Sequence, residues 1–127
     1  MKKFEDDSSI RMKRLNNFDP TRPFTSDVKI SDPENTRWPI ICRGVIDTGA
    51  ARTSIDAGLA QTLNLEHAGR VRVRSANGVQ KRKLVWLRIE VFDEIIVLKA
   101  SITDRSKLSC PILIGRDILH NAYTEEE

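Results

Sequence analysis

One carboxylate in this sequence stands where acid-base chemistry could take place. Asp47 ends an apolar, β-rich run over residues 40–46, and Thr48, Gly49 and Ala50 follow it directly. Small residues after the strand let a second loop of the same kind approach face to face, and Gly49 lets backbone come close to a substrate. Two carboxylates about 3 Å apart share one proton, so one can accept a proton from water while the other donates to a carbonyl oxygen. The pattern therefore indicates water-activating chemistry on an amide.

The chain supplies only half of such a site. Asp47-Thr48-Gly49 occurs once in 127 residues, and Asp56-Ala57-Gly58 lacks the hydroxyl and follows no long strand. Two chains related by a two-fold axis would place both Asp47 side chains on that axis, with each Thr48 hydroxyl able to brace the opposite loop. The alternative interpretation is that Asp47 caps a turn and does no chemistry.

The motif and its surroundings resemble those of retropepsin-like aspartic proteases. Val45 and Ile46 form the hydrophobic lead-in, and Ser54 is the small polar residue downstream. Residues 112–119 are similar to the family's second signature, in which apolar residues and a glycine precede a short helix. Order and spacing agree over about residues 40–122. The resemblance implies a homodimeric aspartic endopeptidase that acts on peptides or proteins.

The resemblance also assigns roles to individual residues. The catalytic residues it implies are Asp47, Thr48 and Gly49. A β-hairpin with Asn77-Gly78 at its tip stands where the family places a flap over the substrate. Asn-Gly favours a tight primed turn, with positive φ at both central residues. An extended peptide under such a flap would pair as an added strand. The implied substrate-binding residues are Ala50, Asn77, Gly78 and Ile114.

Within the superfamily, residues 101–116 resemble a prokaryotic group whose members are often labelled ATP-dependent zinc proteases. The sequence has no glycine-rich phosphate loop followed by Lys-Ser/Thr and no His-Glu-x-x-His motif. His67 and His120 are its only histidines, and each is best interpreted as an isolated histidine. We therefore expect neither zinc nor ATP, and no other cofactor.

Two departures from the family concern the residues around the motif. The prokaryotic group usually has Asp-Thr-Gly-Ala-Arg-Thr-Ser, and this chain has one more alanine, Ala51. Retroviral enzymes usually have an acidic residue where Ala51 stands, and it pairs with the arginine that Arg116 resembles. Ala51 cannot form that pair. A pair between Arg52 and Asp117 is one hypothesis for its replacement.

A cluster of cations without any acidic residue marks the hairpin. Three interpretations are open: a solvated hairpin face, a basic flap that favours acidic substrates, or a nucleic-acid surface. Trp86 is the only aromatic residue nearby, which argues against a base-stacking platform and makes nucleic acid an unlikely partner. The cations are Arg70, Arg72, Arg74, Lys81, Arg82, Lys83 and Arg88.

The elements around these residues predict a mainly β fold. Apolar runs and strict alternation indicate five to seven strands at hairpin spacing, and the pattern over residues 56–63 indicates a short helix capped by Asp56 or Ser54. Residues 116–120 suggest one or two more helical turns. We expect a small closed barrel of the retropepsin type over residues 27–122, a flexible arm over 1–26 and an acidic tail over 123–127.

Composition sets wider limits. A length of 127 residues suits one domain, and a net charge of +3 is too small to identify a partner. Cys42 and Cys110 fit no metal or redox motif, which suggests free thiols in a reducing compartment. The first residues carry no apolar run of a signal peptide, and no apolar stretch could span a membrane. We therefore expect a cytoplasmic protein without membrane contact. The alternative function is a catalytically weak binding module for peptides or nucleic acid.

Overall fold

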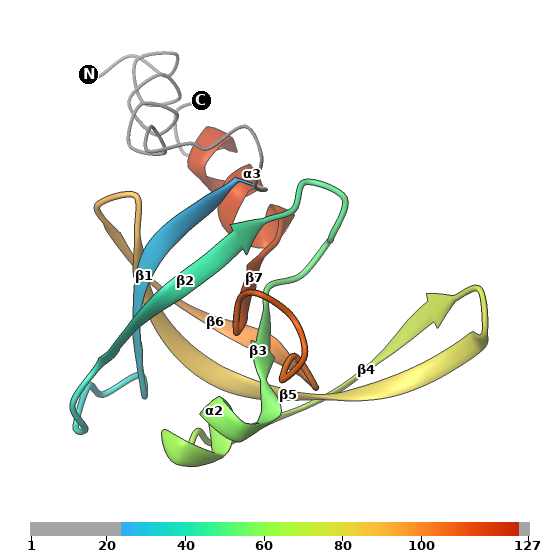
Figure 1. The fold of residues 1–127 in the computed structure, drawn as a ribbon, viewed down its shortest axis with the longest axis horizontal. Coiled ribbons are helices and arrows are strands. Elements are labelled where there is room, and N and C mark those ends of the chain that lie inside the picture. The colour runs from blue at the N-terminus through green and yellow to red at the C-terminus, as the bar shows by residue number, and fades with distance from the viewer. Residues whose placement is uncertain (1–23, 125–127) are drawn as a thin grey trace.

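The computed structural model describes residues 24–124, and these form a mainly β structure, as predicted. Figure 1 shows seven strands and two helices in this part of the chain. In chain order the elements are β1 (Thr25–Ser31), β2 (Ile40–Ile46), β3 (Ser54–Asp56), α2 (Ala57–Thr62), β4 (His67–Ser75), β5 (Gly78–Val91), β6 (Glu94–Thr103), β7 (Ile112–Ile114) and α3 (Arg116–Thr124).

Six of the strands form a closed ring, and β4 lies outside it. The hydrogen-bonded order is β1-β2-β7-β3-β6-β5, and β1 closes the ring by pairing residues 29–31 with residues 88–90 of β5. Within the described residues, β4 pairs with β5 alone. The β4–β5 hairpin therefore projects beyond the ring, on the side of the loop that follows β2 (Figure 1).

The hydrophobic core fills the ring and fixes the register of its strands. Along the second half of β5, Leu87 and Ile89 are fully buried, whereas the alternating residues Trp86 and Arg88 are only half-buried. This alternation follows from the two-residue period of a strand. Removing such side chains from water is the main stabilising contribution of the core. Other fully buried members are Ile30, Ile55, Ile112, Ile114 and Ile118.

The helix predicted over residues 56–63 is present as α2, and Asp56 is its N-cap. The Asp56 carboxylate accepts hydrogen bonds from the backbone N–H groups of Gly58 and Leu59, at 3.0 and 3.3 Å. These bonds satisfy two N–H groups that have no partner inside the helix. Ser54, the other cap considered, belongs to β3 instead.

The tight primed turn predicted at Asn77-Gly78 occurs at another hairpin. Ala76 and Asn77 form the β4–β5 turn, and the positive φ of 112° is at Gly78, the first residue of β5. Since Ser75 pairs with Gly78, Ala76 and Asn77 form a two-residue loop, and the positive φ lies just after it. Phe92 and Asp93 connect β5 to β6 instead, with φ of 54° and 62°. The fourteen-residue β5 and its long pairing with β6 hold Phe92 in a conformation rare for a bulky residue.

The chain ends only partly fall within the described residues. Of the predicted arm over 1–26, residues 1–23 lie outside them, and β1 already begins at Thr25. Of the predicted tail over 123–127, residues 125–127 lie outside, and α3 extends to Thr124. No helix in the described part combines the length and apolar character needed to cross a membrane.

Candidate active site

The strand β2 delivers Asp47 to a loop at the edge of the ring. β2 pairs in parallel with β7, which places Ile46 opposite Ile114. The Asp47 N–H then donates to the Ile114 carbonyl oxygen at 3.0 Å and extends this pairing by one residue. The pairing of β2 with the mostly buried β7 therefore determines where the carboxylate leaves the sheet.

The loop that follows turns back on the Asp47 carboxylate. Asp47 Oδ1 accepts a hydrogen bond from the Gly49 N–H at 2.9 Å, and the Asp47 carbonyl accepts one from the Ala50 N–H at 3.2 Å. The Asp47 side chain is half-buried, whereas Thr48 and Gly49 are exposed. One carboxylate oxygen is thus engaged by the turn, and the surface around it is open for a second molecule.

A buried hydrogen-bond network ties this loop to the start of α3. Thr53 is fully buried, and its Oγ1 donates to Asp117 Oδ1 at 2.7 Å while its N–H donates to Asp117 Oδ2 at 2.9 Å. Thr53 Oγ1 also accepts from the Gly115 N–H at 3.2 Å. A threonine and a carboxylate 64 residues apart therefore satisfy each other in the interior.

Gly115 allows the two segments to cross in close contact. A Cβ at this position would lie 2.7 Å from the Arg52 carbonyl carbon and 3.0 Å from the Ala50 oxygen, both backbone atoms. The Ala50 oxygen also accepts the Arg116 N–H at 2.8 Å. Only a residue without a side chain fits between these groups. We call residues 47–54 and 114–117 the interlocked loops.

Ala51 cannot pair with Arg116 as an acidic residue would, and Arg116 makes a different contact that was not predicted from the sequence. The Arg116 side chain binds the loop at a backbone atom, because its Nη1 donates to the Thr48 carbonyl oxygen at 3.1 Å. The hypothesis of an Arg52–Asp117 pair is wrong. Asp117 accepts from Thr53, and Arg52 Nη1 lies 3.4 Å from the Lys99 carbonyl oxygen. The Thr53 hydroxyl and N–H occupy both oxygens of the Asp117 carboxylate, where the hypothesis placed Arg52.

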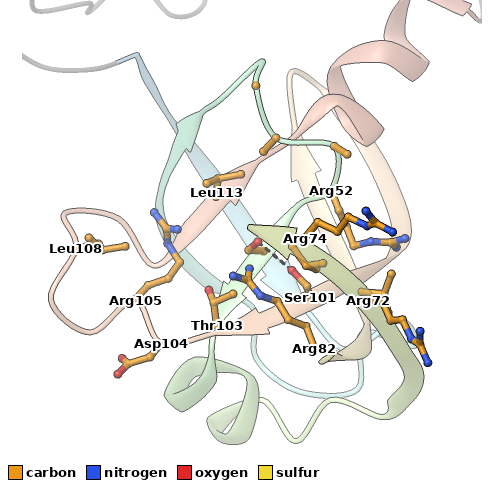
Figure 2. A pocket seen from close by; sticks show the side chains of 16 residues that line it. Arg52, Arg72, Arg74, Arg82, Ser101, Thr103, Asp104, Arg105, Leu108 and Leu113 are labelled. Atoms are coloured by element: carbon orange, nitrogen blue, oxygen red, sulfur yellow. Dashed lines mark hydrogen bonds between the residues drawn. The ribbon is translucent and has the colours of Figure 1, made fainter. Parts of the chain in front are cut away.

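A cleft of about 690 Å³ opens beside the loop, between it and the hairpin. Its walls come from residues 49–52, from β4 and β5, and from the segment around residues 101–108. Figure 2 shows Arg52, Arg72, Arg74 and Arg82 on one side, and Arg105 with Leu108 and Leu113 on the other. The hydroxyls of Ser54 and Ser101 form a hydrogen bond of 3.0 Å inside it. The cleft is large enough for several side chains of a bound peptide.

Of the four predicted substrate-binding residues, one lines the cleft and three do not. Ala50 lines the cleft. Asn77 and Gly78 lie at the hairpin tip, whereas the cleft is lined by the body of the hairpin, residues 71–74 and Arg82. Ile114 is fully buried and belongs to the core, so its prediction needs correction. Because side chains alternate along β7, the neighbouring Leu113 faces the cleft instead.

Several residues that line the cleft were not predicted to belong to the site. Ser101, Thr103, Arg105 and Leu108 line the cleft because β6 pairs in parallel with β3. Such long-range pairing has no local signal in a single sequence. Among residues 24–124, no group of three or more histidine, cysteine, aspartate or glutamate side chains comes together as a metal site requires.

Comparisons with known proteins agree with this geometry. A family model described as aspartyl protease matches residues 34–118. No curated protein sequence matches the chain. The prokaryotic zinc-protease label suggested by residues 101–116 is not confirmed by these comparisons.

Two solved structures show the same fold. The protease of EIAV, complexed with the inhibitor HBY-793, has a TM-score of 0.58 at 17% identity, over 82% of this chain and 91% of that one. The protease of simian foamy virus (mac) has a TM-score of 0.54 at 11% identity, over 80% and 94%. At such identities the likeness establishes the retropepsin fold.

Proposed function

The chain belongs to the aspartyl protease family, and from this premise we propose that it is an aspartic endopeptidase that works as a homodimer. The observation that supports the proposal most directly is the position of Asp47. It follows a strand that pairs with β7, its side chain is half-buried, and the two residues after it are exposed. A second copy of this loop could therefore approach it.

In the proposed dimer, the two Asp47 carboxylates share one proton and hold a water between them. The ionised carboxylate takes a proton from the water, and the oxygen of that water bonds to the scissile carbonyl carbon. The protonated one donates to the carbonyl oxygen. The tetrahedral intermediate then collapses, the C–N bond breaks, and the amine leaves with a proton. No covalent bond to the enzyme forms.

The other predicted residues have supporting roles in this proposal. Thr48 is exposed beside Asp47, where its hydroxyl can contact the partner loop, and Gly49 fixes the carboxylate through its N–H. Ala50 borders the cleft that would receive the substrate. We propose that Asn77 and Gly78 reach the substrate only when the hairpin tip closes over it.

The decisive test is cleavage of a peptide library by the native chain and by Asp47→Asn. Asparagine keeps an Oδ1 acceptor for the Gly49 N–H, so the turn is retained while the titrating carboxylate is lost. We expect products from the native chain only, and a rate per chain that rises with protein concentration as dimers form. Equal circular dichroism spectra and urea midpoints would show that both proteins are folded.

Two results would contradict the proposal. If Asp47→Asn cleaves as fast as the native chain, the carboxylate only caps the turn. A rate that stays flat from about pH 4 to 9 would also argue against a pair of carboxylates that must share one proton. With no Asp47-dependent product at any pH, the alternative of a binding module with this fold would be preferred.

A further inference from the structure

The cleft beside the interlocked loops has an unbalanced charge. Five arginines line it, and Asp104 is the one acidic residue among the lining side chains. The arginines come from four separate elements and connections: Arg52 from the loop after Asp47, Arg72 and Arg74 from β4, Arg82 from β5, and Arg105 from the segment after β6. Because distant parts of the chain converge here, the charge belongs to the folded site and not to one basic stretch.

These arginines have no carboxylate partner within the described residues. The ion pairs found there are Arg43–Asp27 and Arg88–Glu90, both away from the cleft. Arg52 and Arg105 are anchored by carbonyl oxygens, Arg105 through its Nε to Cys110 at 2.8 Å, which leaves its terminal nitrogens available.

Asp104 does not balance the charge. Its carboxylate accepts hydrogen bonds from the Ser106 hydroxyl and N–H, which lower its pKa. Figure 2 shows it at the rim, directed away from the arginines.

Uncompensated cations around a concave surface repel one another and attract anions. Guanidinium groups bind carboxylates with two parallel hydrogen bonds, and such charge-assisted bonds are stronger than neutral ones. Gly49 and Ala50 line the cleft, whereas Asp47 itself does not, so the cleft begins two residues after Asp47 along the loop.

We propose that this cleft is a specificity site for acidic side chains of the substrate, so that the enzyme prefers glutamate or aspartate next to the cleaved bond. The proposal rests on the proposed function. In the dimer, the second subunit would repeat the cleft, so acidic residues are expected on both sides of that bond. A peptide is favoured over a nucleic acid because no aromatic side chain lines the cleft, and Trp86 lies under the Lys99 ammonium at 5.2 Å.

The experiment compares two fluorescent peptide pools on the full-length chain. In one pool, every Glu and Asp of the other is replaced by Gln or Asn, so the pools differ in charge and hardly in shape. Binding is measured by fluorescence anisotropy to the Asp47→Asn protein, which separates recognition from hydrolysis. We expect the acidic pool to bind at least about tenfold more tightly, with a preference that falls as salt rises.

Variants locate the preference within the molecule. Arg74→Gln combined with Arg82→Gln should reduce the ratio of acidic to neutral binding several-fold. Arg70→Gln is the matched control, because it removes the same charge from β4 at an exposed position that does not line the cleft. This control should keep the ratio of the parent protein. Unfolding midpoints in urea would show that all variants remain folded.

The outcomes separate this proposal from the peptidase itself. Equal binding of both pools, or an RNA oligonucleotide bound more tightly than the acidic pool, would overturn the acidic specificity. If the native chain then cleaves the neutral pool in an Asp47-dependent way, the peptidase stands without it. If the acidic pool binds selectively but is never cleaved, recognition of acidic peptides by the cleft stands, and both the peptidase and the preference next to a cleaved bond fail.

Discussion

The interlocked loops and the β4–β5 hairpin face the same cleft, yet they are held in place by different physics. The loops are fixed by buried hydrogen bonds between Thr53 and Asp117 and by the backbone contact at Gly115. The outer hairpin is mostly exposed and depends on pairing within itself. The proposed chemistry, which would need atoms positioned within fractions of an ångström, would thus use the more firmly held region, and the proposed recognition the more exposed one.

The largest expected effect tests the close contact in the interlocked loops. Gly115→Ala would force a methyl group against the backbone of Arg52, and we expect a loss of about 3 kcal/mol in the free energy of unfolding, measured in urea. Gly44→Ala is the matched control. Its Cβ would meet the end of the flexible Ile114 side chain at 3.0 Å, so about 1 kcal/mol or less is expected. Equal losses would show that the contact is not special.

The second test compares a thiol in β2, the strand that leads into the interlocked loops, with a thiol introduced into the hairpin. Burial, with smaller contributions from Cys110 and Asp27, raises the pKa of Cys42 to about 11. In a Cys110→Ala background, Cys42 should therefore react with an alkylating reagent at pH 8 about 100-fold more slowly than a thiol introduced by Gln80→Cys in the exposed hairpin. The Cys42 rate should rise as the pH approaches 11, because the thiolate forms there. Similar rates at pH 8 would mean that β2 opens easily.

A third test removes one hydroxyl from the buried network. Thr53→Val keeps the shape but removes the hydroxyl bond to Asp117 Oδ1 and leaves the Gly115 N–H without its acceptor, and we expect about 2 kcal/mol of destabilisation in urea. The matched control is Thr103→Val. Thr103 Oγ1 is buried and, within the described residues, accepts and donates no hydrogen bond, so this change should be neutral or stabilising. Comparable losses would place the stability in packing alone.

The smallest effect is expected in the hairpin. Arg70→Gln alters an exposed side chain, and the free energy of unfolding should change by about 0.5 kcal/mol or less. A loss of several times this value would show that the hairpin is held as firmly as the loops, and the distinction between the two regions would not hold.

The contrast also explains which features were predictable from the sequence. The apolar strand before Asp47, the capped helix at Asp56 and the hairpin near Asn77 are local patterns, and each is present. The exact turn was not predictable. Pairing along β5 and β6, and not the Asn-Gly signal, decided where positive φ values occur.

Long-range contacts gave no such signal. The Thr53–Asp117 bonds, and the placing of Leu113 rather than Ile114 in the cleft, depend on strands that are adjacent only after folding. The convergence of Arg52, Arg82 and Arg105 likewise combines three segments that the sequence keeps far apart. A local motif identifies Asp47 as the candidate catalytic carboxylate, whereas its surroundings are assembled only on folding.

The unpaired edge of β4 has a further consequence. Within residues 24–124 this strand is hydrogen-bonded to β5 on one side, so the N–H and C=O groups of its other edge could pair with a strand of another molecule. Such edges lead to aggregation unless something keeps other chains away. Arg70, Arg72 and Arg74 follow one another along this edge. Their repulsion toward the same edge of another molecule should keep concentrated solutions free of fibrous assemblies, and screening by salt should weaken that protection.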